Sequence, residues 1–585
     1  MLEQIFTVEP LESLEVLIHL WCQASDSGAR ATALSLLHVM NISRAKSVVP
    51  AILDSLCSRT NPGSQSPARQ SSLTVDLAAA DVVNFFTSYL ESVEDDAIDE
   101  VWTDCTAFMR DVLANPLPFR QVLPALLWVV LILAEKLDNT NFGNARRMRR
   151  DLGDVFQRML AATFTASPSS FYVDTNASMA TRSVETSMTA GRHKLDIVVI
   201  LRHVVAKIES ILESPERMTA TINSISTNVI SPAFHAKAFP STVNADLLSL
   251  LARMTRKTPA AKSWRKDVTD AFGRPQFLNT SSMMMEQYWF PVLQQWSAGD
   301  RERVNDLLSR LAAPSSAGIM FGVGATAARL RADSETQFAL RRLCLLLLAS
   351  PSDTYVMHMS QFEEKLVQLF EASIASSPSS AVKQELFMLF RTLVLTTSSV
   401  QFAPLWPLLN DQLQAALSSL TLGTTSSADL SNLAMLQAGK LLQLLAVLGP
   451  DEFQLHEWLY ITDTTDAVFH PMDWQPASLA DQVAEHLGAA GMGGSELRAS
   501  TSETENGSGP QPRVPLGHNL GYDTEDIKAM PRDDFAKAIM RPFLGQLSIS
   551  AYEGVYSMES PDTSPYRQTL LEDLLDTSTM VEHER

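Results

Sequence analysis

Residues 381–395 read AVKQELFMLFRTLVL, and this stretch decides the predicted fold class. Its apolar residues recur at intervals of four, three, one and three positions, at Val382, Leu386, Leu389, Phe390 and Leu393. In an α-helix of about 3.6 residues per turn, this spacing puts all of these side chains on one face. The stretch therefore predicts a helix whose apolar face is buried against a neighbour.

The same helical spacing recurs towards the N-terminus. One stripe consists of Leu14, Leu17, Ile18 and Trp21, and another of Val82, Phe85, Phe86, Tyr89 and Leu90. Helices of roughly 12 to 22 residues joined by short polar segments are typical of antiparallel pairs stacked into a solenoid, although no strict repeat of about 34 to 47 residues is present. The predicted fold is all-α: an irregular HEAT/armadillo-like helical solenoid of stacked antiparallel helices, with a disordered C-terminal tail.

Composition divides the chain into four segments. Residues 1–166 and 192–490 are helical blocks, and residues 167–191 are a Ser/Thr-rich linker or long loop in which the helical spacing is lost. Residues 491–585 are an acidic tail whose first part is rich in Gly, Ser, Glu and Pro, and we expect it to be largely disordered. We expect two short helices in this mobile tail, at 533–547 and 566–575.

The second short helix of the tail is rich in leucine and acidic residues, with Leu570, Leu571, Leu574 and Leu575 among Glu572, Asp573 and Asp576. An amphipathic helix of this kind can dock in a partner's groove or form a homodimer. It can equally cap the solenoid, and the sequence leaves these alternatives open.

The bulk composition limits the classes of function. Of 585 residues 45% are hydrophobic and 19% charged, which is enough for a sizeable core. A formal net charge of -20 argues against nucleic-acid binding. The four cysteines, Cys22, Cys57, Cys105 and Cys344, show no metal-binding or disulfide spacing, which fits a reducing compartment.

Neither a secretory signal nor a membrane span is expected. The first ten residues lack the basic and apolar regions of a signal peptide. The longest apolar run, 122–134, has 13 residues including Pro124. Because a membrane-spanning helix needs roughly 20 apolar residues, this run predicts a buried helix instead.

Motifs for catalysis or cofactor binding are weak or absent. Residues 322–327 superficially match GxGxxA, but no alternation of strands and helices surrounds them. His456, Asp463, Asp466, His470 and Asp473 fall within 18 residues, without the spacing of a metal or acid/base site. Asp463-Thr464-Thr465-Asp466 is more typical of helix capping and turns. We therefore expect no enzyme activity, no catalytic residues, no cofactor and no metal.

A basic cluster in this acidic chain admits two interpretations. It consists of Arg253, Arg256, Lys257, Lys262, Trp264, Arg265 and Lys266. Cations around a tryptophan can contact anionic phosphoinositide headgroups, each adding about 1 kcal/mol near a charged leaflet. The alternative, which we favour, is a solvated helix face partly balanced by Asp267 and Asp270.

The most distinctive tract is EFQLHEWLYITDTTD at residues 452–466, followed by Asp473-Trp474. It resembles the C-terminal signature of the Dopey family. Tracts at 10–14, 58–62, 137–143 and 146–153 are similar to the fungal branch of that family, and the tract at 264–272 is similar to the family's C-terminal region. The resemblance covers roughly residues 10–490. Family members are several times longer, and the chain looks like their C-terminal portion.

The resemblance implies a non-enzymatic scaffold or adaptor in endosome-to-Golgi and Golgi vesicle traffic. It implies peripheral attachment to the cytoplasmic face of Golgi and endosome membranes, with a large Arf-exchange-factor-like Golgi scaffold and an aminophospholipid flippase as partners. It carries over no catalytic residue. The signature residues expected to be structural or to face a partner are Glu452, Phe453, His456, Trp458, Asp463, Asp466, Asp473 and Trp474.

Overall fold

The computed structural model describes residues 8–24, 26–39, 45–61, 76–140, 145–166, 196–258, 261–298, 302–311, 325–375, 380–420, 430–461, 478–486, 516, 521–545, 547 and 562–581. Across these residues the regular structure is helical and contains no strand. The predicted all-α class is confirmed. The chain forms two compact units, unit 1 at Met1–Ala271 and unit 2 at Phe272–Arg585.

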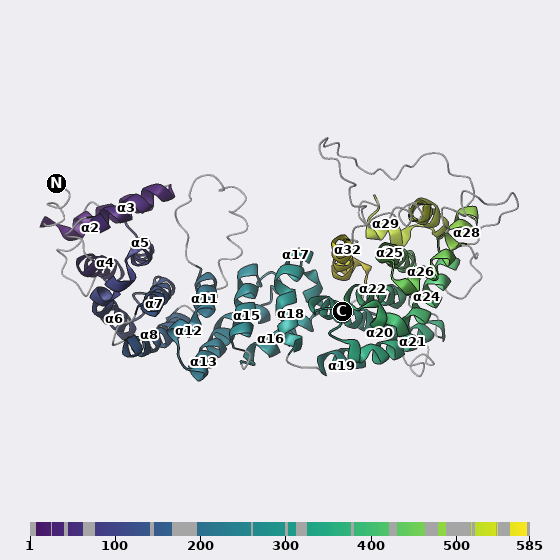
Figure 1. Ribbon diagram of the computed structural model, residues 1–585, viewed down its shortest axis with the longest axis horizontal. Helices are drawn as coiled ribbons and strands as arrows, with labels where there is room; N and C mark the ends of the chain where they lie inside the picture. The colour runs from purple at the N-terminus through teal and green to yellow at the C-terminus, as the bar shows by residue number, and fades with distance from the viewer. Residues whose placement is uncertain are drawn as a thin grey trace. The chain divides into compact units, whose positions relative to one another are not determined.

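Unit 1 is a stack of helices in chain order (Figure 1). Its main helices are α2 (Pro10–Gln23), α3 (Ser27–Val39), α4 (Ala45–Thr60), α5 (Ala79–Ser92), α6 (Ile98–Ala114), α7 (Leu123–Asp138), α8 (Ala145–Ala166), α11 (Ile197–Ala206), α12 (Ile208–Ile211), α13 (Pro215–Ile225), α14 (Ser231–His235), α15 (Ala245–Lys257) and α16 (Ser263–Phe272). Each packs on near neighbours in sequence: α4 on α5, α5 on α7, α7 on α8 and α11 on α15. This serial packing is what an irregular helical solenoid requires.

Unit 2 is also built from stacked helices. They include α17 (Ser282–Met284), α18 (Phe290–Ala298), α19 (Glu302–Ser309), α20 (Ala325–Ala349), α21 (Met359–Ala375), α22 (Ser380–Thr396), α23 (Ser399–Phe402), α24 (Trp406–Ser418), α25 (Asn432–Leu448), α26 (Asp451–Gln454), α28 (Leu479–His486), α29 (Thr524–Ala529), α30 (Arg532–Phe535) and α32 (Ser564–Leu575). Helix α22 packs between α20 and α25 and therefore lies at the centre of the unit.

The apolar stripes form the cores of the two units, as the sequence predicts. Val382, Leu386, Leu389, Phe390 and Leu393 of α22 are all buried. Val82, Phe85, Phe86, Tyr89 and Leu90 of α5 are buried as well. The apolar run 122–134 lies almost entirely in α7, which is covered by α5, α8 and α11. Among the helices that the structure describes, none is long and apolar enough to cross a membrane.

The predicted linker at 167–191 lies outside the described residues and stays a prediction. The helices on its two sides belong to one unit, since α7 and α8 pack against α12. The boundary between the compact units follows Ala271 instead.

Much of the predicted tail, including 491–515 and 548–561, lies outside the described residues. The two expected short helices are present, as α30 with the helical turn that follows it (Ala536–Met540), and as α32. They are not free segments of a mobile tail, because Phe535, Met540 and Leu570 are fully buried. Helix α32 packs on α20 and α22 (Figure 1).

Candidate functional site

The first part of the signature tract folds as two tight helical turns after α25. Gly449 ends α25 in the left-handed conformation at φ 51°, which only glycine adopts without strain. The chain then enters α26 and a 3-10 turn at Glu457–Leu459. Gln454 fixes the turn, because its side-chain amide donates a 2.7 Å hydrogen bond to the Gly449 carbonyl.

Two buried aromatic rings anchor this segment. Phe453 and Tyr460 are both fully buried, and their rings stack with centroids 6.0 Å apart. The Tyr460 hydroxyl donates a hydrogen bond to the backbone carbonyl of Asn410 in α24 at 3.2 Å. The backbone carbonyl of Tyr460 accepts a hydrogen bond from the Ala480 amide at 3.1 Å. Burial, with a smaller contribution from Asp411, raises the pKa of Tyr460 above its usual range. The signature segment (residues 452–461) therefore has a fixed base.

The signature segment also presents two large apolar side chains to solvent. Leu455 is 71% exposed and Trp458 is 61% exposed. His456 is also exposed, and its Nδ1 lies 2.9 Å from the Glu452 carbonyl. The remaining signature residues, Asp463, Asp466, Asp473 and Trp474, lie outside the described residues, as does His470.

The basic cluster is only partly available to a ligand. Trp264 is 2% exposed and its indole donates to the Ala261 carbonyl at 2.9 Å, so its ring is covered by neighbouring residues of the chain. Arg253 donates to the Arg202 carbonyl at 3.2 Å, and Lys257 pairs with Glu209 at 3.1 Å.

The other cations of the cluster are more accessible. Arg256, Lys262 and Lys266 are exposed, and Arg265 is half-buried with its guanidinium 5.7 Å from the Trp264 ring centroid. A contact of these four with lipid headgroups stays a prediction.

The acidic residues expected to balance the basic cluster also contact groups outside it, although Lys266 still lowers the pKa of Asp267 through its charge. The buried Asp267 accepts a hydrogen bond from Ser231 at 3.1 Å, and its carboxylate lies 3.7 Å from His235. Asp270 lies 3.7 Å from the other nitrogen of the same imidazole. Burial raises the pKa of Asp267, and the Ser231 hydrogen bond opposes that shift.

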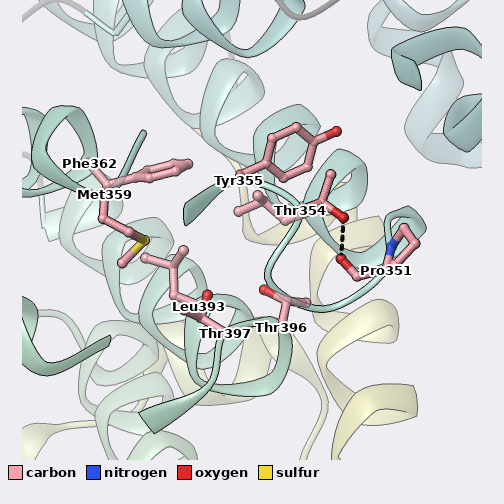
Figure 2. Close-up of a pocket in the computed structure, with 9 residues that line it drawn as sticks. Pro351, Thr354, Tyr355, Met359, Phe362, Leu393, Thr396 and Thr397 are labelled. Carbon is pink, nitrogen blue, oxygen red and sulfur yellow. Dashed lines mark hydrogen bonds between the residues drawn. The ribbon is translucent and has the colours of Figure 1, made fainter. Parts of the chain in front are cut away.

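A small cavity lies between the end of α20, the loop that follows it, and helices α21 and α22. Figure 2 shows Met359, Phe362 and Leu393 lining it together with Thr354, Tyr355 and Thr396. It has room for about one water molecule, which is too small for a cofactor. Among the described residues, no group of three or more His, Cys, Asp or Glu side chains could hold a metal ion.

The cysteines show no sign of a reactive site among the described residues. All four are free thiols, with Cys105 and Cys344 buried and Cys22 and Cys57 half-buried. Burial, followed by nearby carboxylates, raises the pKa of Cys57 to about 11 and that of Cys105 to about 12. Because the thiolate is the nucleophile, these shifts disfavour reaction near neutral pH.

Unit 2 contains an ionic cluster that was not predicted from the sequence. It consists of Arg341, Glu385, Arg391, Lys440 and Asp573, and it joins α20, α22 and α25 to α32. Charged residues within otherwise apolar helices, such as Lys440 in AGKLLQLL, are the signal that could have revealed it, because such residues are rarely buried unless paired.

The cluster contains two sets of ion pairs. The Arg341 guanidinium contacts Glu385 at 2.8 Å, with side chains 0% and 1% exposed. Asp573 accepts from Arg391 at 2.6 Å and from Lys440 at 2.7 Å, and its side chain is 17% exposed. Arg391 also donates to Gln437 at 2.6 Å, and Gln337 donates to Glu385 at 3.1 Å.

The pKa values of the two acids shift in opposite directions. For Glu385, burial raises the pKa and outweighs the attraction of Arg341. For Asp573, burial alone would raise the pKa, but Lys440 and Arg391 together lower it below 3.8. The ion pairs of Asp573 therefore stabilise the fold above the ordinary carboxyl pKa, and this contribution is lost as the pH falls through the lowered value.

We expect the stability difference between the native chain and Asp573→Asn to depend on pH. It should be largest near pH 7 and shrink as the pH falls below the ordinary carboxyl pKa and through the lowered value of Asp573, because a protonated aspartate resembles asparagine. Urea unfolding of both proteins at a series of pH values measures it. Both proteins contain Glu385, Glu572 and the three cations. The effect of their titration therefore cancels, to first order, in the stability difference. A constant difference across the pH range would contradict the assignment.

The chain is similar in sequence to proteins of one family. The model described as DOP1 C-terminal matches residues 85–557. Protein dop1 of Emericella nidulans is 39% identical over 581 residues, which cover 99% of this chain and 31% of that protein. Protein DOP1 of Saccharomyces cerevisiae is 25% identical over 604 residues, 98% of this chain and 32% of that protein.

A more distant relative is protein pad-1 of Caenorhabditis elegans, 24% identical over 277 residues, which cover 44% of this chain and 11% of that protein. The chain spans 31% and 32% of the two fungal relatives' lengths. No solved structure matches it.

Proposed function

The chain belongs to the Dopey family, and from this premise we propose that it is a protein-binding part of a scaffold or adaptor in endosome-to-Golgi and Golgi vesicle traffic. It works without catalysis, by holding partners at the cytoplasmic surface of the membrane. The similarity to protein dop1 of Emericella nidulans over 99% of the chain supports the assignment to traffic. The stacked helices of each unit offer extended surfaces of the kind that solenoids use for binding.

The observation that carries this proposal is the exposed apolar pair of the signature segment. Single exposed apolar residues are common on protein surfaces. Leu455 and Trp458, however, lie three positions apart on a segment that Phe453 and Tyr460 anchor in the core. Binding to an anchored backbone segment orders less of the chain than binding to a free one, and tryptophan is enriched among residues that dominate interface energies.

The partners that fit this role are the large Arf-exchange-factor-like Golgi scaffold and the aminophospholipid flippase. Binding to such membrane-associated proteins gives peripheral attachment without a membrane-spanning helix. The signature segment is the surface we assign to one of these two partners.

Replacing Trp458 by Ala is expected to reduce binding to that partner about 30-fold, since loss of a central aromatic side chain costs about 2 kcal/mol. Titration of the purified chain with each purified partner, by calorimetry or surface binding, measures the change. Folding should be unaffected, because Trp458 is 61% exposed.

Met357→Ala is the matched control, because Met357 is 91% exposed in the same unit but lies outside the signature. It should bind as tightly as the native chain. If Trp458→Ala and the double variant Leu455→Ala/Trp458→Ala both keep native affinity for both partners, the signature segment is not the binding surface.

A further inference from the structure

Helix α32 sits on a strongly cationic face of unit 2. We define the docking face as α20 and α22 together with Lys440 of α25. Four charged residues of this face are buried where α32 packs on it: Arg341, Arg391, Lys440 and Glu385. Without the charges of α32 itself, they carry an excess of two formal positive charges. Buried cations without partners are costly, so this face favours an acidic ligand.

The ligand-like features of α32 lie on one side of the helix. Leu570, Leu571 and Leu574 are at most 1% exposed, and Asp573 meets Arg391 and Lys440. Positions i, i+1, i+3 and i+4 share a helix face, so the pattern Leu-Leu-x-Asp-Leu presents all four side chains together.

The docking face also recognises the end of the helix. Arg341 donates to the Leu574 carbonyl at 3.2 Å and to the Asp576 carbonyl at 2.7 Å, where α32 stops. A cation at a helix C-terminus is favoured by the helix dipole, and carbonyls in the last turn of a helix, such as that of Leu574, lack a partner from the regular helical pattern. A ligand must therefore end its helix within about one turn of the last leucine.

Further contacts come from the same short segment. Arg567 donates to the Leu348 carbonyl, and the Val581 amide donates to Gln337 at 2.9 Å. A peptide of residues 562–581 consequently contains every group named above on the α32 side.

We propose that the docking face is a binding site for acidic, leucine-rich helices of partner proteins that carry Leu-Leu-x-Asp-Leu near a helix end, and that α32 occupies it as an intramolecular ligand. This site differs in place and chemistry from the signature segment, and it does not depend on the proposed role in traffic. A ligand helix of the same chain competes with an added helix at a high effective concentration. The native chain therefore binds an added helix only weakly, and weakening α32 opens the site.

The test uses the full chain with Asp573→Lys, which places a fourth cation in the ionic cluster and so disfavours docking of its own α32. Fluorescence anisotropy with a labelled peptide of residues 562–581 should show binding at least tenfold tighter than to the native chain. The same peptide carrying Asp573→Lys should bind neither chain.

Gln568→Lys is the control, because Gln568 is an exposed residue of the same helix. A full chain with Gln568→Lys should behave like the native chain, and a peptide with Gln568→Lys should bind the Asp573→Lys chain normally. If the native and Asp573→Lys peptides bound the Asp573→Lys chain equally well, the proposal would be overturned, because the site would not distinguish an acidic from a basic ligand.

A second measurement covers the case in which the Asp573→Lys chain does not fold. A specific protease site placed at 552–558 of the otherwise native full chain allows α32 to be cut free after folding. The cut chain should stay folded and exchange its helix for labelled peptide. Failure to exchange, or unfolding after cleavage, would show that α32 is a permanent core element. Dimer formation without peptide uptake would assign the site to a second copy, and each of these outcomes overturns the proposal.

Discussion

Replacing Arg341 by Met should lower the free energy of unfolding of unit 2 by about 3–5 kcal/mol. The guanidinium is fully buried, pairs with Glu385 at 2.8 Å and donates to two carbonyls of the segment that ends α32. Methionine fills much of the same volume but leaves the Glu385 carboxylate buried without its cation. Urea unfolding followed by tryptophan fluorescence measures the loss.

Arg310→Met is the control for removing an arginine. Arg310 pairs with Asp306 four residues earlier on the surface, with side chains 56% and 61% exposed, so its loss should cost less than about 0.5 kcal/mol. Adding Glu385→Gln to Arg341→Met should recover part of the stability, because the unpaired charge is then removed. If the free energy of unfolding of the Arg341→Met chain lay within 1 kcal/mol of the native value, the pair of Arg341 and Glu385 would not be buried as described.

Truncation of Phe453 to Ala is the second change with a large expected effect, a loss of about 3–5 kcal/mol. Phe453 is fully buried and stacks on Tyr460, and together they hold the signature segment against α24. The cavity left by the ring cannot be filled by a short turn without moving its backbone. Thermal or urea unfolding measures the loss of stability, and hydrogen exchange of residues 450–461 should rise with it.

Two further variants separate the stability of the signature segment from its binding. Tyr460→Phe removes only the hydroxyl that donates to Asn410 and should cost about 1 kcal/mol. Trp458→Ala should leave stability unchanged while it weakens binding. If Phe453→Ala unfolded at the same temperature as the native chain, Phe453 would not anchor the signature segment. The segment would then not hold Trp458 in place for a binding partner.

The local part of this fold could be predicted from the sequence. Apolar residues at helical intervals, as in 381–395, specify both a helix and the face that it buries, because the spacing of side chains around a helix is a property of consecutive residues. The all-α class and the buried helix at 122–134 follow from this local rule. The family follows from the signature tract, which is a property of the residue order itself.

Which charged side chains pair, and which aromatic side chains are exposed, depends on the tertiary structure. Asp573 meets Lys440 and Arg391 across 133 and 182 residues of sequence, and no local pattern specifies such a pairing. Trp264 among cations and Trp458 among acidic residues look similarly amphipathic in sequence, yet one is 2% exposed and the other 61%. The sequence determined which faces of the helices are apolar; only their packing determined which apolar or charged groups are covered, because burial depends on neighbours that are distant along the chain.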